Sequence, residues 1–440
     1  MTLFKNHYRH IILLVGLLCL TSLASNHITW TFTIICMENE SHYNYDTFEN
    51  ALINWGVAVG TICGAFPFHW AYMKFDAKVP FLVSGIISIV STALIPLAAD
   101  SIYFLVALRF LQGFAYSSSF TIIGLISMKW SPLSELTIFL GTLTSYVGIA
   151  PTITNSVGGL VCESLGWRWV FYLHAIAGVT LFGVWSILYV ENPENTKRVS
   201  EEELLKIKKD KVQQDTKNKI PYAKIITSPV ILVVWLNAFT IVSMFSFFTF
   251  YMPVYYKSVL KYSIKETGIL TAVSIGFAIP IRILAAIIFD KLTMFPERLK
   301  IIVYNLFSIG FVGLVVSLIG FVENRTLVFI LCLIAFSVSA CNCGSYYKCA
   351  ERHSLQYYPF VISVIQFMKC VALFTCIGIY ALFVSDNENR VKWIPAFLTL
   401  GMANILVASL SIFVLTDKPA EWTKIEKPSP HIDFSQFDTL

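Results

Sequence analysis

The sequence predicts an all-α membrane protein in which twelve transmembrane helices form two bundles of six, with both termini on the cytoplasmic side. Three observations carry this prediction. Hydrophobic residues make up 56% of the 440 residues and charged residues only 13%, about half the charged share of a typical soluble domain. The apolar residues fall into runs of roughly 20, the length that crosses a bilayer. One long polar segment, residues 191–229, divides these runs six and six.

The expected units are a first bundle at 1–190, a cytoplasmic loop at 191–229, a second bundle at 230–416 and a cytoplasmic tail at 417–440. The first apolar run resembles a signal peptide that ends before Asn26. It continues through "ITWTFTIIC", so we expect a retained helix. The twelve runs lie near 10–36, 51–73, 79–99, 102–128, 137–161, 167–190, 230–256, 268–289, 301–321, 327–347, 360–384 and 394–416.

The basic residues predict the orientation. Lys and Arg concentrate in the loops on the side of the N-terminus, and the first loop on the other side, "MENESHYNYDTFEN", contains neither. By the positive-inside rule, the N-terminal side is cytoplasmic. Both Asn-x-Ser/Thr sites, Asn39 and Asn324, then lie in outside loops, where glycosylation is expected.

The central loop is expected to contain a short cytoplasmic helix over about 201–213. Ser200 and Glu203 have the spacing of a capping box, and Val199 with Leu204 fits a hydrophobic staple. An alternative is that "EEELL" is a sorting signal, but a plain helix explains the same residues.

The ten cysteines predict neither a disulfide nor a metal site. Nearly all lie in apolar runs, where cysteine behaves as a small hydrophobic residue. "CNC" at 341–343 lacks the paired spacing of a zinc site. We expect no cofactor.

Three cations, Arg109, Arg282 and Lys369, fall inside the apolar runs, whereas all 27 Asp and Glu fall in loops, tails or run ends. A cation within a bilayer costs a few kcal/mol unless it faces a polar cavity or a partner. Gln112, Tyr116 and Ser119 follow Arg109 at i+3, i+7 and i+10 and form one polar stripe. The stripe indicates that Arg109 faces a cavity. The alternative is hydrogen bonding to a neighbouring helix.

The other two cations are weaker candidates. Lys369, with Gln366 one turn before it, either lines the same cavity or extends its stem to the cytoplasmic interface. Arg282 lies closer to the cytoplasmic end of its run, which favours such an extension. Cations without carboxylate partners make a site electropositive, and the arginine fork suits carboxylate or phosphate. The predicted ligand is therefore a small anion.

Several stretches carry a resemblance to a known family. "RFLQG" at 109–113 resembles the fourth-span motif of the major facilitator superfamily. A more specific similarity, to the anion transporters that include sialin, the vesicular glutamate transporters and the sodium–phosphate cotransporters, rests on further segments. These are "KWSPLSE" at 129–135, "GGLVCESLGWRWVFYLHAIAG" at 158–178, "ENPE" at 191–194, "VSEEE" at 199–203, "ITSPV" at 226–230 and "YMPVYYKSVLKYSIKETGILTAV" at 251–273.

The resemblance implies a two-bundle fold that opens alternately to either side and carries anions, with Arg109 in the position of the family's fourth-span arginine. It also implies cytoplasmic gating residues, here Lys74, Lys78, Glu135, Asp290 and Lys291. The lipid bilayer, a small anionic solute and a coupling ion, sodium or proton, are the implied partners. We expect a monomer in a plasma, lysosomal or vesicular membrane.

Departures from the family pattern are informative. Tyr116 stands where the family has a carboxylate implicated in proton coupling, and Ile241 where vesicular glutamate transporters have a second arginine. Met73 replaces the acid, and His69 the glycine, of the loop before Lys74 and Lys78, so this half of a cytoplasmic latch is expected to be weak.

His27, beside Asn26 in the first run, lies near the position of a family arginine. It either titrates in the cavity or packs as a neutral ring. Pro151 and Pro280 are expected to kink their helices.

The sequence therefore predicts a secondary transporter of a small organic anion or phosphate. A ligand-sensing or scaffolding relative without transport is the alternative, because Tyr116 and Met73 replace family acids. An enzyme is not expected, since no run brings together a base and a nucleophile. Nucleic-acid binding is not expected either, because the net charge of +5 is spread over the loops.

Overall fold

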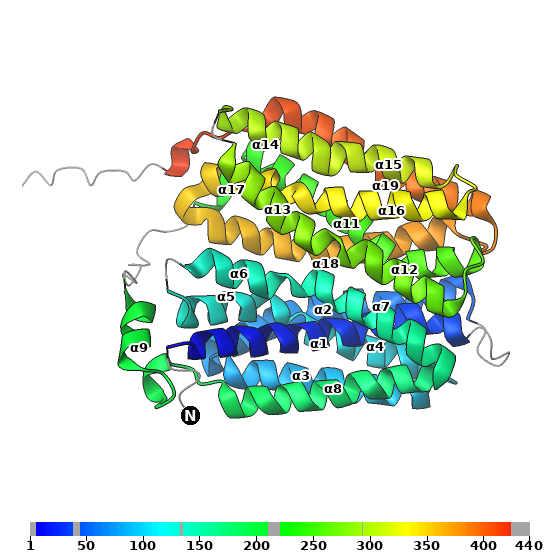
Figure 1. Cartoon of the computed structure of the whole chain (residues 1–440), viewed down its shortest axis with the longest axis horizontal. Helices are drawn as coiled ribbons and strands as arrows, with labels where there is room; N and C mark the ends of the chain where they lie inside the picture. The colour runs from blue at the N-terminus through cyan, green and yellow to red at the C-terminus, as the bar shows by residue number, and fades with distance from the viewer. Residues whose placement is uncertain (1–5, 38–44, 133–134, 210–220, 293, 424–440) are drawn as a thin grey trace, which may run out of the picture.

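The computed structural model describes residues 6–37, 45–132, 135–209, 221–292 and 294–423. Within these ranges the chain is helical, without a strand, and its helices gather into two bundles that lie side by side (Figure 1). The first bundle contains α1 (Tyr8–Met37), α2 (Thr47–Phe75), α3 (Lys78–Ala98), α4 (Ile102–Tyr116), α5 (Ser119–Trp130), α6 (Leu136–Thr144), α7 (Tyr146–Ser164) and α8 (Trp167–Leu188).

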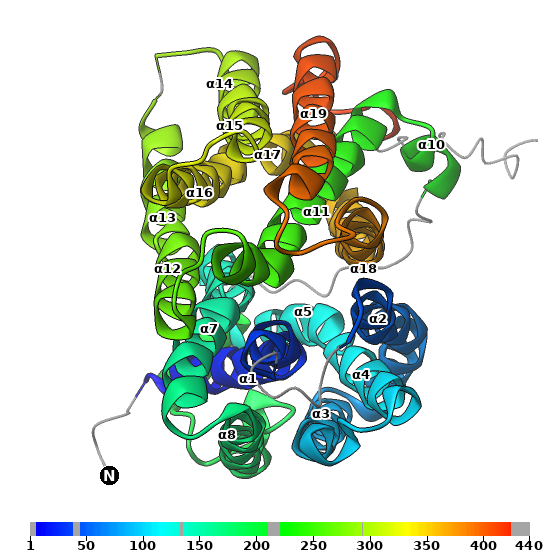
Figure 2. The same ribbon diagram turned by 90° about the vertical axis from the view of Figure 1, so that its right-hand side faces the viewer.

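The second bundle is seen above the first in Figure 2. It contains α11 (Pro229–Ser258), α12 (Ile264–Gly276), α13 (Ala278–Lys291), α14 (Glu297–Asn305), η3 (Leu306–Phe311), α15 (Val312–Ile319), α16 (Arg325–Ser339), η4 (Ala340–Gly344), α17 (Tyr346–Ser354), η5 (Leu355–Tyr357), α18 (Tyr358–Phe383) and α19 (Arg390–Val414). Short helices outside the bundles are η2 (Pro193–Asn195), α9 (Glu201–Lys208), α10 (Tyr222–Ile226) and η6 (Glu421–Thr423).

Eleven segments of the described chain are long and apolar enough to cross a membrane. The run predicted at 137–161 is not among them, and in the structure it is divided into α6 and α7 at Ser145. A similar break separates α12 from α13 at Phe277. Pro151 and Pro280 follow these breaks by a few residues, consistent with the hydrogen bond that a proline removes from a helix. Large apolar side chains such as Leu97 and Phe413 face outward, as a lipid-facing surface requires.

The polar loop helix is attached to the first bundle. α9 and η6 lie at one end of the molecule, on the left in Figure 1, which we call the α9 end. Asn6 bonds to Glu202 of α9 there. Ser200 Oγ accepts a hydrogen bond from Glu203 N at 3.2 Å, so the predicted N-cap is confirmed. The predicted extension to 213 is wrong in the described part, since α9 ends at Lys208 and Lys209 already has extended backbone.

Glycines on α2 allow α2 and α4 to pack at backbone distance. A Cβ on Gly60 would overlap the Phe110 carbonyl, and one on Gly113 would overlap the Val57 carbonyl. Small residues spaced four apart, here Gly56, Gly60 and Gly64, commonly permit such contacts between membrane helices. This packing fixes α2 beside the face of α4 that carries Arg109.

The bundles meet through α7 with α12, α2 with α18, and α1 with α11. A Cβ built on Gly159 would lie 3.1 Å from the Cα of Gly268. Trp55 Nε1 donates to the Phe374 carbonyl at 3.2 Å. Gly268 is in the first turn of α12 and Trp55 in the first half of α2, and both helices begin at the end opposite α9. The described contacts therefore hold the bundles together in that half of the molecule.

A disulfide joins Cys36 at the end of α1 to Cys162 near the end of α7, with 6.2 Å between the two Cα atoms. The prediction of no disulfide was wrong. The partners are 126 residues apart, so their spacing gave no indication that the helix ends meet. Disulfides persist in oxidising compartments, and this one lies at the end opposite α9.

Candidate functional site

Arg109 lies at the centre of the first bundle, and its side chain is only 1% exposed. Its Nη1 donates to the His27 carbonyl at 2.6 Å and to Gln112 Oε1 at 2.7 Å. Its Nη2 donates to Asn54 Oδ1 at 3.0 Å. Its Nε has no hydrogen-bond partner. All three partners are neutral, so the described residues orient the guanidinium without neutralising it.

Gln112 acts as a positioning residue for Arg109. Its Nε2 donates to the Asn26 carbonyl at 3.0 Å and to Thr92 Oγ1 at 2.8 Å. Because its Oε1 accepts from Arg109, both ends of the amide are occupied. Gln112 thus connects α4 to α1 and α3, which fixes the direction of the arginine.

His27 and Tyr116 form one wall of this site. Their ring centroids are 4.3 Å apart. The Tyr116 hydroxyl lies 3.2 Å from that of Tyr146, which also lies 3.4 Å from Ser119 Oγ. His27 is buried, with the Leu23 backbone one turn earlier as its hydrogen-bonding neighbour. The structure therefore brings together the predicted stripe of α4 and the predicted histidine of α1.

The second bundle covers the site with aromatic rings from α11. The Phe250 centroid lies 6.3 Å from that of His27, and Tyr251 lies within electrostatic reach of Arg109. Two surface hollows, of about 190 Å³ beside α9 and about 300 Å³ between α3 and α8, are lined by other residues than Arg109. The arginine is closed off from solvent in this conformation.

The remaining predicted cations lie outside this cluster. Lys369 is half-buried on α18, without a hydrogen bond or ion pair to the described residues of the cluster. The Gln366 side chain lies outside the described part. Arg282 is exposed on α13, and its Nη2 donates to Asn342 Oδ1 at 3.2 Å.

At the α9 end, the loop between α2 and α3 contains an acid, Asp76, at a different position from the acid that the family pattern has at Met73. Asp76 Oδ1 lies 2.7 Å from Lys129 Nζ, and Glu191 Oε2 lies 3.0 Å from the same nitrogen. Glu191 Oε1 also accepts from Lys78 N at 2.5 Å. Asp76, three residues after Met73, therefore supplies this loop with a paired acid, and the expected weakness of this latch half stays a prediction. Lys74 instead lies over the rings of Trp70 and Phe75.

In the second bundle, Lys291 is exposed at the end of α13, and the Asp290 side chain lies outside the described part. The described pairing there uses Glu297, with Lys300 at 2.7 Å and Arg352 at 3.0 Å.

Of the two predicted glycosylation sites, Asn39 lies outside the described residues. Asn324 is exposed, and its Oδ1 caps α16 by accepting from Thr326 N and Leu327 N.

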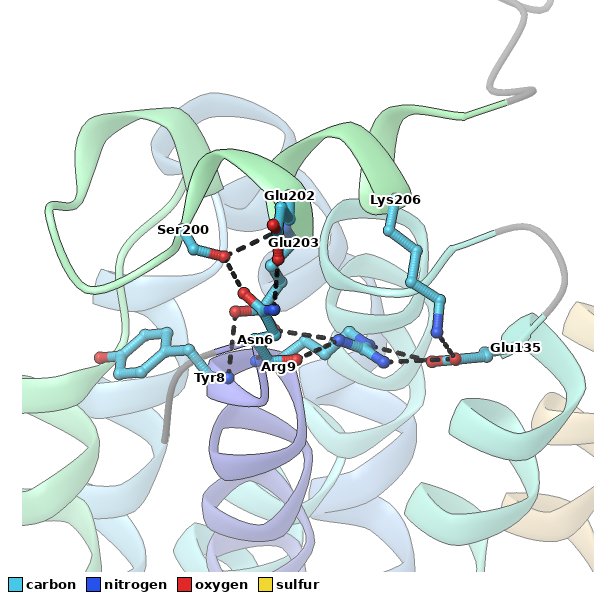
Figure 3. A network of polar contacts seen from close by, with 8 residues as sticks. All are labelled: Asn6, Tyr8, Arg9, Glu135, Ser200, Glu202, Glu203 and Lys206. Carbon is cyan, nitrogen blue, oxygen red and sulfur yellow. Dashed lines mark hydrogen bonds and ion pairs between the residues drawn. The ribbon is translucent and has the colours of Figure 1, made fainter. Parts of the chain in front are cut away.

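Glu135 belongs to a polar network, the α9 clamp, which consists of Arg9, Glu135, Glu203 and Lys206 (Figure 3). Glu135 pairs with Arg9 Nε at 3.0 Å and with Lys206 Nζ at 2.6 Å. Glu203 accepts from Tyr8 N at 3.2 Å and from Arg9 N at 2.9 Å. The reciprocal half of the predicted capping box was therefore wrong, because the Glu203 carboxylate caps α1 and not its own helix.

Comparisons with known proteins agree with this architecture. Residues 14–375 match the family model described as Major Facilitator Superfamily. The chain is 23% identical over 453 residues to sodium-dependent phosphate transport protein 1 of Oryctolagus cuniculus, with 95% of each chain covered. It is 29% identical over 191 residues to sialin of Ovis aries, which covers 41% of this chain and 37% of sialin.

Solved structures show the same fold. A bacterial homologue of the human lysosomal transporter Spinster, in an inward-facing and unoccupied conformation, superposes with a TM-score of 0.69 at 14% identity, covering 96% of this chain and 99% of that one. A D-xylose-proton symporter gives the same TM-score and identity over 93% and 98%. With a family model that spans most of its length and a matching two-bundle fold, the chain belongs to the Major Facilitator Superfamily.

Proposed function

We propose that the protein is a secondary transporter that carries a small anion across a membrane by alternating access, with Arg109 as the anion-binding cation. The observation that carries the proposal is the electrostatic state of Arg109. It is buried, it is held by a carbonyl and two amides, and its Nε–H is unpaired. Relatives named for sodium-dependent phosphate transport and for urate export support an anionic substrate.

An anion is the partner that this arginine lacks. A buried unpaired charge costs several kcal/mol, and neutral ligands offset only part of that cost. No Asp or Glu of the described chain forms a hydrogen bond or ion pair with Arg109. The guanidinium has five donors in a planar fork, and three are used. A carboxylate or phosphate oxygen accepts from the others.

Alternating access follows from the closure over Arg109. The rings of α11 and α1 cover it, and the described contacts between bundles lie mainly in the half opposite α9. We propose that parting the bundles at the α9 end opens the site toward the cytoplasm. The disulfide at the opposite end supports this orientation, because that end would face an oxidising compartment.

The driving force that fits this site best is the membrane potential. Tyr116 bonds to Tyr146 where a titrating carboxylate would be needed, so the described cluster offers no carboxylate for proton coupling. An anion carried alone moves net charge, worth about 2.3 kcal/mol per charge per 100 mV. Uptake that requires sodium or a pH gradient at zero potential would show that a coupling ion is used instead.

The test is uptake into liposomes by the purified protein, with radiolabelled phosphate and a panel of organic anions. Arg109→Ala is expected to abolish uptake while the amount of folded protein stays normal. Arg109→Lys, which keeps the charge but not the fork, should retain a small fraction. The matched control is Arg168→Ala, an exposed arginine beside Trp167, and it should transport normally. Unchanged uptake by Arg109→Ala would contradict the assigned role.

A further inference from the structure

Tyr251 is a tyrosine of the second bundle that lies within electrostatic reach of Arg109. It belongs to α11 and is 1% exposed. Its ring stacks on Tyr380 of α18 with 3.9 Å between centroids and 11° between planes. The ring centroid of Phe247, on the same helix, lies 5.3 Å from that of Tyr251. These contacts fix the ring, and a phenylalanine would make all of them.

The Tyr251 hydroxyl is buried, and no well-formed hydrogen bond pairs it with a described residue; the Asn54 side chain of the first bundle is its hydrogen-bonding neighbour. Leaving a buried polar group unpaired is costly, and such groups are rare in folded proteins. Tyr380, the other half of the stack, donates to Asn387 Oδ1 at 2.7 Å. Packing explains the ring of Tyr251, whereas its oxygen has Asn54 as a neighbour, whose Oδ1 already accepts from Arg109.

The position of this hydroxyl indicates its use. It lies within electrostatic reach of Arg109 and within hydrogen-bonding reach of Asn54, both in the first bundle. Arg109 Nε is also buried without a partner among the described residues. The adjacent ring, Phe250, contacts His27 across the same interface. Side chains of both bundles therefore lie around Arg109.

We infer that the Tyr251 hydroxyl donates a hydrogen bond to the anion bound at Arg109, so that the substrate is held by both bundles at once. The inference rests on the proposed function. It gives the second bundle, which contributes no cation to this cluster, a side chain that binds the anion. The Tyr251 hydroxyl and Arg109 Nε both donate hydrogen bonds, so the substrate atom that they share must be an acceptor. A carboxylate or phosphate oxygen is such an acceptor. Binding would then favour the conformation in which α11 lies against α1, because only that conformation supplies both donors.

The experiment compares Tyr251→Phe with Tyr380→Phe, which removes the other hydroxyl of the same stack. Uptake rates against anion concentration give KM and the maximal rate, and the melting temperature is measured with and without anion. Tyr251→Phe should raise KM about 10-fold or more, as expected for a lost hydrogen bond to a charged group, without lowering the melting temperature in the absence of anion. Tyr380→Phe should keep KM and lower the melting temperature, because Asn387 loses its donor.

A double variant separates a direct contact from a structural one. If Tyr251 and Arg109 hold the same oxygen, the effects of Tyr251→Phe and Arg109→Lys on KM should not multiply. A KM of Tyr251→Phe within twofold of the wild type, with wild-type stabilisation by anion, overturns the Tyr251 assignment and leaves the proposed function standing. A wild-type protein that carries none of the tested anions overturns the proposed function itself.

Discussion

At the scale of the residue, the neighbours of Arg109 decide what the site can hold. The sequence predicted the partner that lies on the same helix, since Gln112 follows Arg109 at helical spacing. It did not predict Asn54, whose contact with Arg109 depends on the close packing of α2 on α4. The Gly56, Gly60 and Gly64 repeat was the available signal, because small residues at that spacing mark a close helix contact.

Asp76 is a second residue that the structure revealed. It adopts φ 58° and ψ −156° at the end of α2, a region occupied almost only by glycine. The strain costs about 1–3 kcal/mol, whereas an exposed ion pair contributes about 0–1 kcal/mol. The acid is therefore kept at a net cost in stability, which points to a role in holding Lys129 during the transport cycle.

Asp76→Gly should accordingly raise the melting temperature of the purified protein and lower its maximal transport rate. The backbone strain is relieved, and Lys129 keeps Glu191 but loses Asp76. Asp76→Asn, which retains the strain and loses the charge, is the matched variant and should not gain stability. A lower melting temperature for Asp76→Gly would show that the ion pair outweighs the strain.

At the scale of the element, the α9 clamp attaches the central loop to the first bundle. Helix formation by α9 was predicted from local spacing, because Ser200 caps its own helix. The contacts of the Glu203 side chain were not predicted, since its partners Tyr8 and Arg9 are almost 200 positions away. A local motif defines where a helix starts but not which distant backbone its side chains reach.

The clamp predicts a specific pH dependence. The hydrogen bond from Arg9, with help from Lys206, lowers the pKa of Glu135 from 4.5 to about 2. A folded-state pKa below the unfolded value stabilises the protein above pH 4.5, and that stability is lost as the pH falls toward 2. The full difference is worth about 3 kcal/mol at most.

Melting temperatures measured between pH 6 and pH 2.5 test this. The wild type should lose more stability over that range than Glu135→Gln, which has no carboxylate to protonate and starts from a lower value at pH 6. Parallel curves for the two proteins would exclude Glu135 as the titrating group.

At the scale of the whole molecule, the class and the two-bundle plan were predictable because apolar run length and the polar divider are properties of the sequence itself. The disulfide and the contacts between bundles were not, since both depend on which helix ends meet. Cys36 and Cys162 look like any other apolar cysteine until α1 and α7 are placed side by side.

The contact of α7 with α12 gives a prediction about the transport cycle. A side chain at Gly268 would start 2.5 Å from the Asn155 carbonyl, so Gly268→Leu should prevent the bundles from closing at the end opposite α9. Uptake is expected to disappear while anion binding persists from that side. Gly124→Leu, at a glycine with open space around it, is the control. Wild-type uptake by Gly268→Leu would mean that the closed conformation is not required.

The central claim is that Arg109 carries a positive charge that only the substrate neutralises, and Asn54→Asp tests it most directly. This change places a carboxylate where Oδ1 already lies 3.0 Å from Arg109 Nη2, with almost no change in shape. Asn342→Asp is the matched control outside the site, because Asn342 Oδ1 lies 3.2 Å from Arg282 Nη2. We predict that Asn54→Asp remains folded, with an unchanged or higher melting temperature, and loses anion uptake, whereas Asn342→Asp transports. Normal anion uptake by a folded Asn54→Asp protein would contradict the account.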